Sequence, residues 1–227
     1  MAKNTDKSEA CEGGPRRGRP PKGSEESRRK ALLAAAEEVF LEKGLAASMD
    51  DIAKRAGVSK KTIYGCSETK EKLFADVMHT RIENSMVSEL PDSVANAQAL
   101  EDALVQFFTE LSRFVLSPVS VRLYRAVTAE ATRFPELART YYEEGPAHVI
   151  DILGKWLAAR ARDGIIALEN PSEAAAILGS SVIAGPLRNL ALGVGGTPTT
   201  TSIEQRARTT AQFFLRGALT DKARAKS

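Results

Sequence analysis

The chain of 227 residues is poor in cysteine and in aromatic residues. Its two cysteines, Cys11 and Cys66, form neither a disulfide framework nor a metal-ligand spacing, so we expect a reduced, cytoplasmic setting. Aromatic residues make up 6% of the chain, while Ala, Leu, Glu, Lys and Arg abound. Because the abundant residues favour helices over strands, the composition predicts an all-α protein.

Long apolar runs are also scarce. The N-terminus is charged from Lys3 onward and lacks the apolar segment of a secretory signal. The longest uncharged apolar stretch, Ala174 to Leu187, is interrupted by Gly185 and Pro186. It is shorter than the ~20 residues that cross a bilayer, so we predict a soluble protein with no membrane partner.

The sequence lacks the motifs of catalysis and cofactor binding. It has no nucleophile elbow and no phosphate loop, and Gly193-Val194-Gly195-Gly196 follows no strand and is typical of a linker. His79 and His148 are isolated from cysteine and from each other, which argues against a metal site. We therefore predict neither an enzyme nor a bound cofactor.

The stretch from Arg28 to Phe74 contains three short helical patterns. Ser48 and Ser59 stand where helix N-caps are expected, and Gly57 lies in the turn between the second and third helices. Two helices joined by a short turn with Gly form a helix-turn-helix, which presents its second helix to a DNA major groove. That helix begins Ser59-Lys60-Lys61-Thr62, so two cations and a hydroxyl lie at its exposed start. The pattern predicts a DNA-binding surface.

Positive charge is concentrated just before this stretch. The net charge of the chain is only +3, but residues 15–30 hold seven Lys and Arg residues against two Glu residues. Such a segment is often a solvated tail. Beside a helix-turn-helix, attraction to DNA phosphates is the better explanation.

Breaks in the apolar pattern divide the chain into four parts. These are a disordered basic arm (1–23), a three-helix helix-turn-helix domain (24–72), a larger helical bundle (73–222) and a short tail (223–227). Ser24 is the expected cap of the first helix. In the bundle, prolines are expected to open helices at Pro118, Pro135, Pro146 and Pro171, and Pro186 to kink the last of these.

The ordered runs of the N-terminal half resemble the TetR family of bacterial transcription regulators. The resemblance lies in Phe40-Leu41-Glu42-Lys43-Gly44, Ser48-Met49-Asp50-Asp51-Ile52-Ala53, Ala56-Gly57-Val58-Ser59-Lys60-Lys61-Thr62-Ile63-Tyr64 and Thr69-Lys70-Glu71-Lys72-Leu73-Phe74. It covers about a fifth of the chain and is highly specific. Phe134-Pro135-Glu136-Leu137, Tyr141-Tyr142 and Gly145-Pro146 resemble the C-terminal domain of its AcrR/AefR-like branch.

The resemblance implies a homodimer that binds double-stranded operator DNA and is released by a small effector. By carry-over, Lys60, Lys61 and Thr62 reach base edges, while Ser48, Tyr64 and Lys70 contact phosphates. It also implies that residues 73–222 bind the effector and form the dimer. Repressor action on a palindromic operator is the expected function.

The arm contains Arg16-Arg17-Gly18-Arg19-Pro20, which resembles the core of an AT-hook. Gly and Pro keep such a segment extended and narrow, and arginines favour the negative potential of an A·T-rich minor groove. Arg17 and Arg19 are therefore further candidates for DNA contact, with a plain solubilising tail as the alternative.

One segment departs from the family pattern. Members usually carry an aromatic or imidazole where Cys66 stands and Phe or Val where Ser67 stands, and Gly65 adds flexibility. We expect a loose exit from the recognition helix and weakened DNA binding. The rival hypothesis is therefore a protein of the same fold that binds or sequesters a small molecule.

Two sets of apolar residues are candidates for the remaining functions. The aromatic-rich set would line a pocket for a small hydrophobic effector, with plain core packing as the alternative. It comprises Phe107, Phe108, Leu111, Phe114, Tyr124, Tyr142 and Trp156. The second set lies on two helices too apolar for one subunit to cover, so pairing across a two-fold axis would bury them. It comprises Ile177, Val182, Leu187, Phe213 and Phe214.

Overall fold

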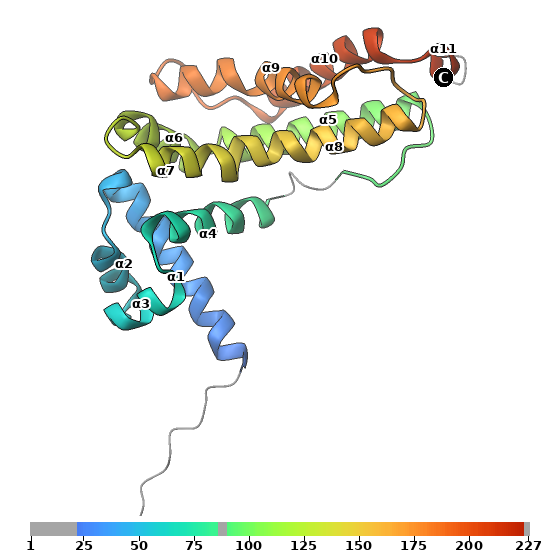
Figure 1. Cartoon of the computed structure of the whole chain (residues 1–227). Helices are drawn as coiled ribbons and strands as arrows, with labels where there is room; N and C mark the ends of the chain where they lie inside the picture. The colour runs from blue at the N-terminus through green and yellow to red at the C-terminus, as the bar shows by residue number, and fades with distance from the viewer. Residues whose placement is uncertain (1–21, 86–89, 225–227) are drawn as a thin grey trace, which may run out of the picture.

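The computed structural model describes residues 22–85 and 90–224, which form two helical layers (Figure 1). Helices α1 to α4 make the smaller layer, and α5 to α10 make the larger one. Within the described ranges the chain forms no strand, and one isolated bridge pairs Ile166 with Leu219. The all-α prediction is confirmed.

The smaller layer combines the long helix α1 with three shorter helices that begin at polar caps. Its elements are α1 (Lys22–Lys43), the 3-10 turn η1 (Gly44–Ala46), α2 (Met49–Ala56), α3 (Lys60–Cys66) and α4 (Lys70–Glu83). Ser48, Ser59 and Thr69 each accept a hydrogen bond from the third residue of the helix that follows, as a capping hydroxyl does. The predicted caps of α2 and α3 are confirmed, and Thr69 caps α4 in the same way. The first helix differs, because it begins at Lys22, ahead of the predicted cap Ser24.

The core of the smaller layer extends beyond the helix-turn-helix segment. Phe40 of α1 and Phe74 of α4 meet edge-to-face, with ring centroids 4.8 Å apart. Leu123, Val127 and Leu137, which belong to the larger layer, are buried in the same cluster. The two layers therefore pack directly against each other. The core of the smaller layer includes residues beyond position 72, where we placed the domain boundary.

The larger layer contains the helices from α5 onward. They are α5 (Ala97–Val115), α6 (Pro118–Glu130), α7 (Pro135–Tyr142), α8 (His148–Arg162), α9 (Pro171–Ala191), α10 (Thr200–Ala218) and the short α11 (Asp221–Arg224). The predicted helix starts at Pro118, Pro135 and Pro171 are confirmed. Pro146 is different. It lies inside a π-helical turn, Glu143–Ala147, that joins α7 to α8 without a break, since its missing N–H is tolerated there.

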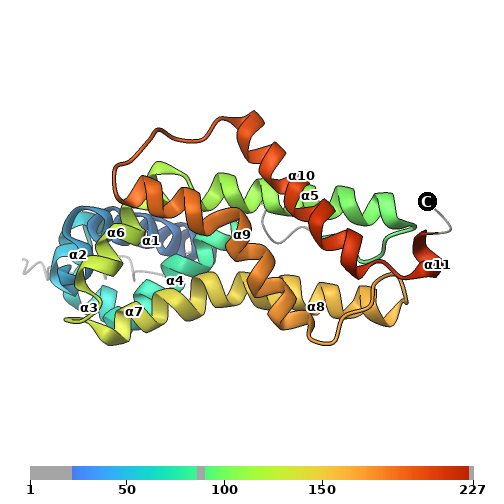
Figure 2. The ribbon, with the colours of Figure 1, turned by 90° about the horizontal axis from the view of Figure 1, so that it is seen from above.

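Helix α9 is longer than the sequence indicated. It runs 21 residues from Pro171 to Ala191 with Pro186 inside it, so it extends beyond the uncharged stretch from Ala174 to Leu187. Among the described residues it is the one helix long and apolar enough to span a bilayer. One such helix is weak evidence, and α9 packs against α8, α5, α6 and α10 (Figure 2). Only 17% of its apolar window is buried, so much of its surface is left uncovered.

Candidate nucleic-acid interface

The turn between α2 and α3 has the geometry of a helix-turn-helix. Gly57 adopts φ +65°, a left-handed conformation that side chains disfavour, and so ends α2. The Val58 N–H then donates to the Ala53 carbonyl at 3.0 Å. Ile52 and Ile63 are fully buried and anchor the two helices to the core. This packing leaves the opposite face of α3 in solvent.

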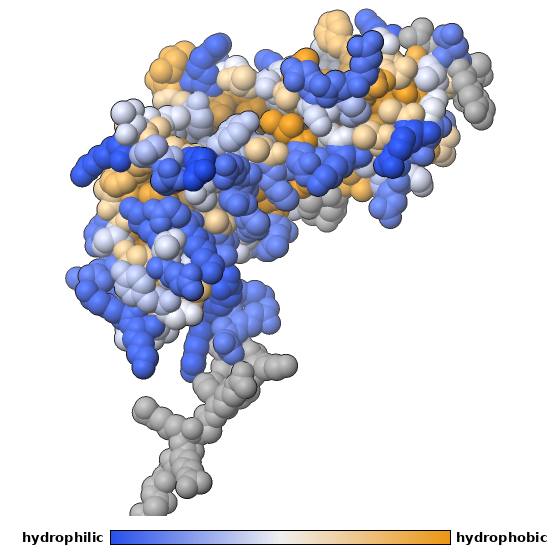
Figure 3. Space-filling view, viewed as in Figure 1, coloured by the Kyte–Doolittle hydropathy of each residue, from blue (hydrophilic) through white to orange (hydrophobic). Residues whose placement is uncertain are grey.

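The exposed face of α3 carries the predicted base-contacting residues. Lys60, Lys61 and Thr62 are all exposed, and 49% of Tyr64 is exposed. The Ser59 hydroxyl accepts from the Thr62 N–H at 3.1 Å and lies 2.8 Å from the Thr62 hydroxyl. Ser59 therefore fixes the start of the helix on which the two lysines stand. Figure 3 shows hydrophilic side chains over the end of the molecule formed by α1, α2 and α3.

The two lysines differ in their surroundings. The Lys60 ammonium donates to the Asp50 carboxylate at 2.5 Å, and this hydrogen bond raises the pKa of Lys60. No ion pair to Lys61 occurs within residues 22–85 and 90–224. Lys61 is therefore free to meet a phosphate or a base edge, while Lys60 must first leave Asp50.

Ser48 and Asp51 form a capping box at the start of α2. The Ser48 hydroxyl accepts from the Asp51 N–H, and the Ser48 N–H donates to the Asp51 carboxylate at 3.0 Å. Lys43, at the end of α1, pairs with the same carboxylate. Lys43 and the two Ser48 donors hold the pKa of Asp51 well below its usual range. Ser48 thus has a structural task besides its predicted phosphate contact.

Lys70 lies elsewhere than the prediction requires. Its ammonium donates to the Leu45 carbonyl at 2.8 Å and stands 4.7 Å from the centre of the Phe134 ring. The side chain is half-buried between the two layers. In this structure Lys70 joins α4 to η1 rather than facing solvent, because a ring from the larger layer attracts its cation.

The segment after α3 is closed rather than loose. Ser67 is buried, and its N–H donates to the Ile63 carbonyl at 2.9 Å, which ends the helix. Its hydroxyl donates to the Thr69 carbonyl at 3.3 Å. Gly65 and Cys66 are exposed and lie within regular α3. The predicted loose exit was therefore wrong, because capping of the next helix fixes it. Arg17 and Arg19 of the arm lie outside the described residues.

Four of the seven predicted effector residues belong to the packed core of the larger layer. Phe107, Phe108, Leu111 and Trp156 are buried in the main cluster of the larger layer. The Trp156 indole N–H donates to the Pro91 carbonyl at 2.7 Å. Phe114 and Tyr124 are half-buried, and Tyr142 is exposed. None of the seven lines either of the two cavities described below.

Three of the five predicted dimer residues lie together at the surface, and the other two do not. Ile177 of α9 and Phe213 of α10 are exposed by 60% and 70%, and with half-buried Phe214 they line an apolar groove of about 500 Å³. Leu187 is half-buried outside this groove. Val182 is fully buried within its own subunit, so its assignment to a dimer surface was wrong. It lies on the face of α9 that is turned to the core. The run of apolar residues in the sequence did not show which residues belong to that face.

The two histidines are neighbours in space. The rings of His79 on α4 and His148 on α8 stack with centroids 5.9 Å apart, although we described them as isolated from each other. His79 also contacts the Glu144 carboxylate. No group of three or more His, Cys, Asp or Glu side chains that could hold a metal ion occurs in the described part of the chain.

Several arginines that join the layers gave no signal in the sequence. Arg81 of α4 contacts Glu37 of α1 and donates to the Ser120 hydroxyl of α6 at 2.8 Å. Arg122 of α6 donates to the Leu41 carbonyl at 3.3 Å. Each partner lies at least 39 positions away, so no local pattern could have indicated these contacts. They connect α6 of the larger layer directly to α1 and α4 of the smaller layer.

Two family profiles match this arrangement of a helix-turn-helix layer under a helical bundle. The profile described as bacterial regulatory proteins, tetR family, matches residues 32–77. The profile described as AefR-like transcriptional repressor, C-terminal domain, matches residues 102–217. The chain belongs to the TetR family. As a TetR-family protein it is a DNA-binding transcription regulator and not an enzyme.

Individual relatives agree with the assignment to the TetR family. The chain is 41% identical over 101 residues to the HTH-type transcriptional activator FasR of Mycolicibacterium smegmatis. It is 36% identical over 103 residues to the HTH-type transcriptional regulator YdeS of Bacillus subtilis. These matches cover 42% and 45% of this chain and 45% and 48% of the relatives. The chain therefore spans about half the length of the curated relatives it matches.

Solved TetR-family structures match over most of the chain. The flavonoid-responsive regulator FrrA is 32% identical with a TM-score of 0.69, covering 86% of this chain and 99% of that chain. A TetR transcriptional regulator from Agrobacterium tumefaciens has a TM-score of 0.74 at 22% identity, covering 88% of this chain and 98% of that chain. The second likeness supports the fold alone.

Proposed function

We propose that the protein is a cytoplasmic repressor that binds a palindromic operator as a homodimer and is released by a small molecule. The exposed start of α3 is the observation that carries the DNA-binding part of this proposal. Its two lysines stand on a helix fixed by the Ser59 cap and by buried Ile63, so they meet a groove in one orientation. Lys61 is the residue from which we expect the largest contribution.

The uncovered faces of α9 and α10 support a homodimer. Ile177, Phe213 and Phe214 line an apolar groove between α9 and α10. These two helices lie on the side of the molecule away from α2 and α3 (Figure 1). A two-fold axis through this face would bury the groove of each subunit against the other and place both α3 helices on the same DNA. We expect operator half-sites about one helical turn, ~34 Å, apart.

Contacts between the layers support release by a ligand. A ligand acts only through different affinities for two conformations, so its site must be coupled to the DNA-binding layer. Arg81 and Arg122 supply such coupling, because both join the larger layer to α1. FrrA is named as flavonoid-responsive, and by analogy we propose a small hydrophobic effector here. The repressor assignment follows the AefR-like profile, although FasR is named as an activator.

Binding to DNA upstream of the protein's own gene tests the proposal. We expect the purified protein to shift one such fragment in a salt-dependent, sequence-selective way. Lys61→Ala should weaken binding about 10-fold or more, since a bidentate base contact contributes about 1–3 kcal/mol. Lys155→Ala, which removes an exposed lysine of α8, is the matched control.

Two results would overturn the proposal. One is a protein that ignores every upstream fragment at low salt, which would favour the sequestering alternative. The other is equal DNA affinity for the wild type and the Lys61 variant, which would exclude α3 as the reading helix.

A further inference from the structure

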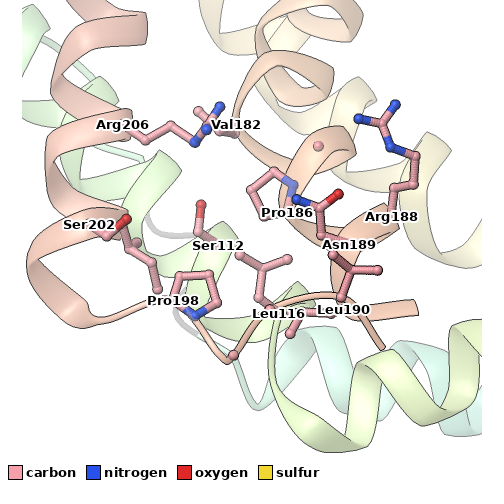
Figure 4. Close-up of a pocket in the computed structure, with 15 residues that line it drawn as sticks. Ser112, Leu116, Val182, Pro186, Arg188, Asn189, Leu190, Pro198, Ser202 and Arg206 are labelled. Atoms are coloured by element: carbon pink, nitrogen blue, oxygen red, sulfur yellow. The ribbon is translucent and has the colours of Figure 1, made fainter. Parts of the chain in front are cut away.

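A second cavity, of about 400 Å³, lies away from the aromatic core. It is enclosed by the end of α5, the last turns of α9, the connection 192–199 and the start of α10 (Figure 4). Its volume is at the small end of the range for ligand sites. None of the aromatic residues that we assigned to an effector pocket lines it.

The cavity wall carries two arginines and no acidic residue. Arg188 comes from α9 and Arg206 from α10, and both side chains are exposed. Figure 4 shows Arg206 extending toward α9 across the cavity, whereas the Arg188 side chain leaves the side of α9 away from α10. Arg206 pairs with no carboxylate among the described residues and donates only to the Ser181 carbonyl, at 3.3 Å. By contrast, Arg113 and Arg208 each contact a glutamate. An uncompensated guanidinium group at a cavity without carboxylates favours an anion.

A buried hydroxyl faces the same space. Ser112 of α5 is only 2% exposed, and its hydroxyl points toward the middle of the cavity (Figure 4). No hydrogen bond to this hydroxyl occurs within residues 22–85 and 90–224. The hydroxyl is open to the cavity, so a ligand oxygen there would supply a hydrogen-bond partner.

The helix ends around the cavity also favour a bound anion. Ser202 and Ile203 line it from the first turn of α10, so the positive end of a 19-residue helix lies beside it. The negative end of α9 is also close, but Arg125 of α6 donates to the Leu190 and Ala191 carbonyls there. The negative end of α9, which would repel an anion, is thereby compensated. The positive end of α10, which would attract an anion, remains available.

We propose that this cavity binds a small organic anion, whose charged group contacts Arg206 and the Ser112 hydroxyl. The remaining wall includes Leu116, Pro186 and Pro198, which suit a short apolar body. The ligand is therefore a carboxylate or phosphate ester of a few carbons rather than an inorganic ion. This site is additional to the hydrophobic effector proposed above and does not depend on it.

Calorimetric titration of the full-length protein, without DNA, tests this site. Hexanoate and hexyl phosphate are the anionic probes, and n-hexanol is the neutral probe of the same chain length. We expect at least one anion to bind about 10-fold or more tightly than the alcohol, as hydrogen bonds to charged groups require. The tighter of the two anions identifies the head group. Equal binding of the alcohol, or binding of neither anion, would overturn the proposal.

Variants assign the binding to this cavity. Arg206→Gln should weaken binding of the tighter anion about 10-fold, and Ser112→Ala should weaken it by a smaller factor. Arg162→Gln is the matched control, because Arg162 is an exposed arginine in the last turn of α8 and does not line the cavity. Unchanged affinity in the Arg206 variant would contradict the proposal. Since no DNA is present, this result is independent of the operator experiment.

Discussion

At the scale of single residues, the pairing of Lys60 with Asp50 weakens the DNA-binding surface. The Asp50 carboxylate is 2.5 Å from the Lys60 ammonium and would itself face the phosphates of bound DNA. The free protein therefore holds one of the two lysines that we propose to contact DNA bases in a surface ion pair. Such pairs contribute little to stability, so Asp50 is open to substitution.

Replacing Asp50 with Asn should tighten DNA binding. We expect an affinity gain of about 2- to 5-fold, the equivalent of one exposed ion pair, because Lys60 becomes available and a negative charge is lost. The slope of log K against log salt should become steeper by about one ion. Fluorescence anisotropy with operator DNA measures both. Asp102→Asn, an exposed position of α5, is the control, and weaker binding by Asp50→Asn would contradict this role.

Gly65 is a residue whose replacement should stabilise the fold. A Cβ built at Gly65 meets nothing within 4 Å, and the residue lies inside α3. Gly65→Ala should raise the free energy of unfolding by about 0.5–1 kcal/mol, because alanine restricts the unfolded chain and favours the helix. Gly57→Ala is the paired test. It also has open space, but φ +65° should cost it about 1–2 kcal/mol. Urea denaturation measures both changes in the free energy of unfolding. If both variants were stabilised, or both destabilised, this prediction would be wrong.

At the scale of elements, the junction of α1 and α2 makes stability depend on pH. The folded-state pKa of Asp51 is lowered, first by Lys43 and then by the Ser48 donors. A carboxylate with a lowered pKa stabilises the fold above its unfolded value, near pH 4, and loses this contribution as the pH falls further.

Lys43→Met should therefore flatten the acid limb of the stability curve. We expect lower stability than the wild type at neutral pH and a smaller further loss below about pH 4, because the main cause of the Asp51 shift is gone. Thermal unfolding at a series of pH values measures it. Lys155→Met removes an ion pair of α8 and is the control. If the variant lost as much stability below pH 4 as the wild type does, the Lys43–Asp51 pair would not be a source of the pH dependence.

How much of each element could be predicted depended on the range of its interactions. The caps at Ser48, Ser59 and Thr69 were recognisable because a capping hydroxyl and its N–H are three residues apart. The burial of Lys70 was not, since Phe134 lies in another layer. The same holds for the stacked rings of His79 and His148, which are distant in the sequence. Local chemistry specifies helix ends, whereas contacts between layers appear only once the helices pack.

At the scale of the whole molecule, the exposed groove of α9 and α10 predicts how the subunits associate. Phe213→Glu places a charge in the groove, and burial of an unpaired charge is costly, so we expect dimers to dissociate at micromolar concentration. Analytical ultracentrifugation measures the change. Val119→Glu alters an exposed apolar residue of α6 outside the groove and should leave the association unchanged. A Phe213 variant that remains dimeric would place the interface elsewhere.

Helix α6 has a consequence for how this regulator could be re-engineered. Leu123 and Val127 project from it into the core beneath, alongside Phe40 and Phe74. A fragment ending after α4 would expose that core to water, so the portion that reads DNA is not a detachable cassette. Chimeras that transplant it onto a different sensor should succeed only when the donor's α6 travels with it.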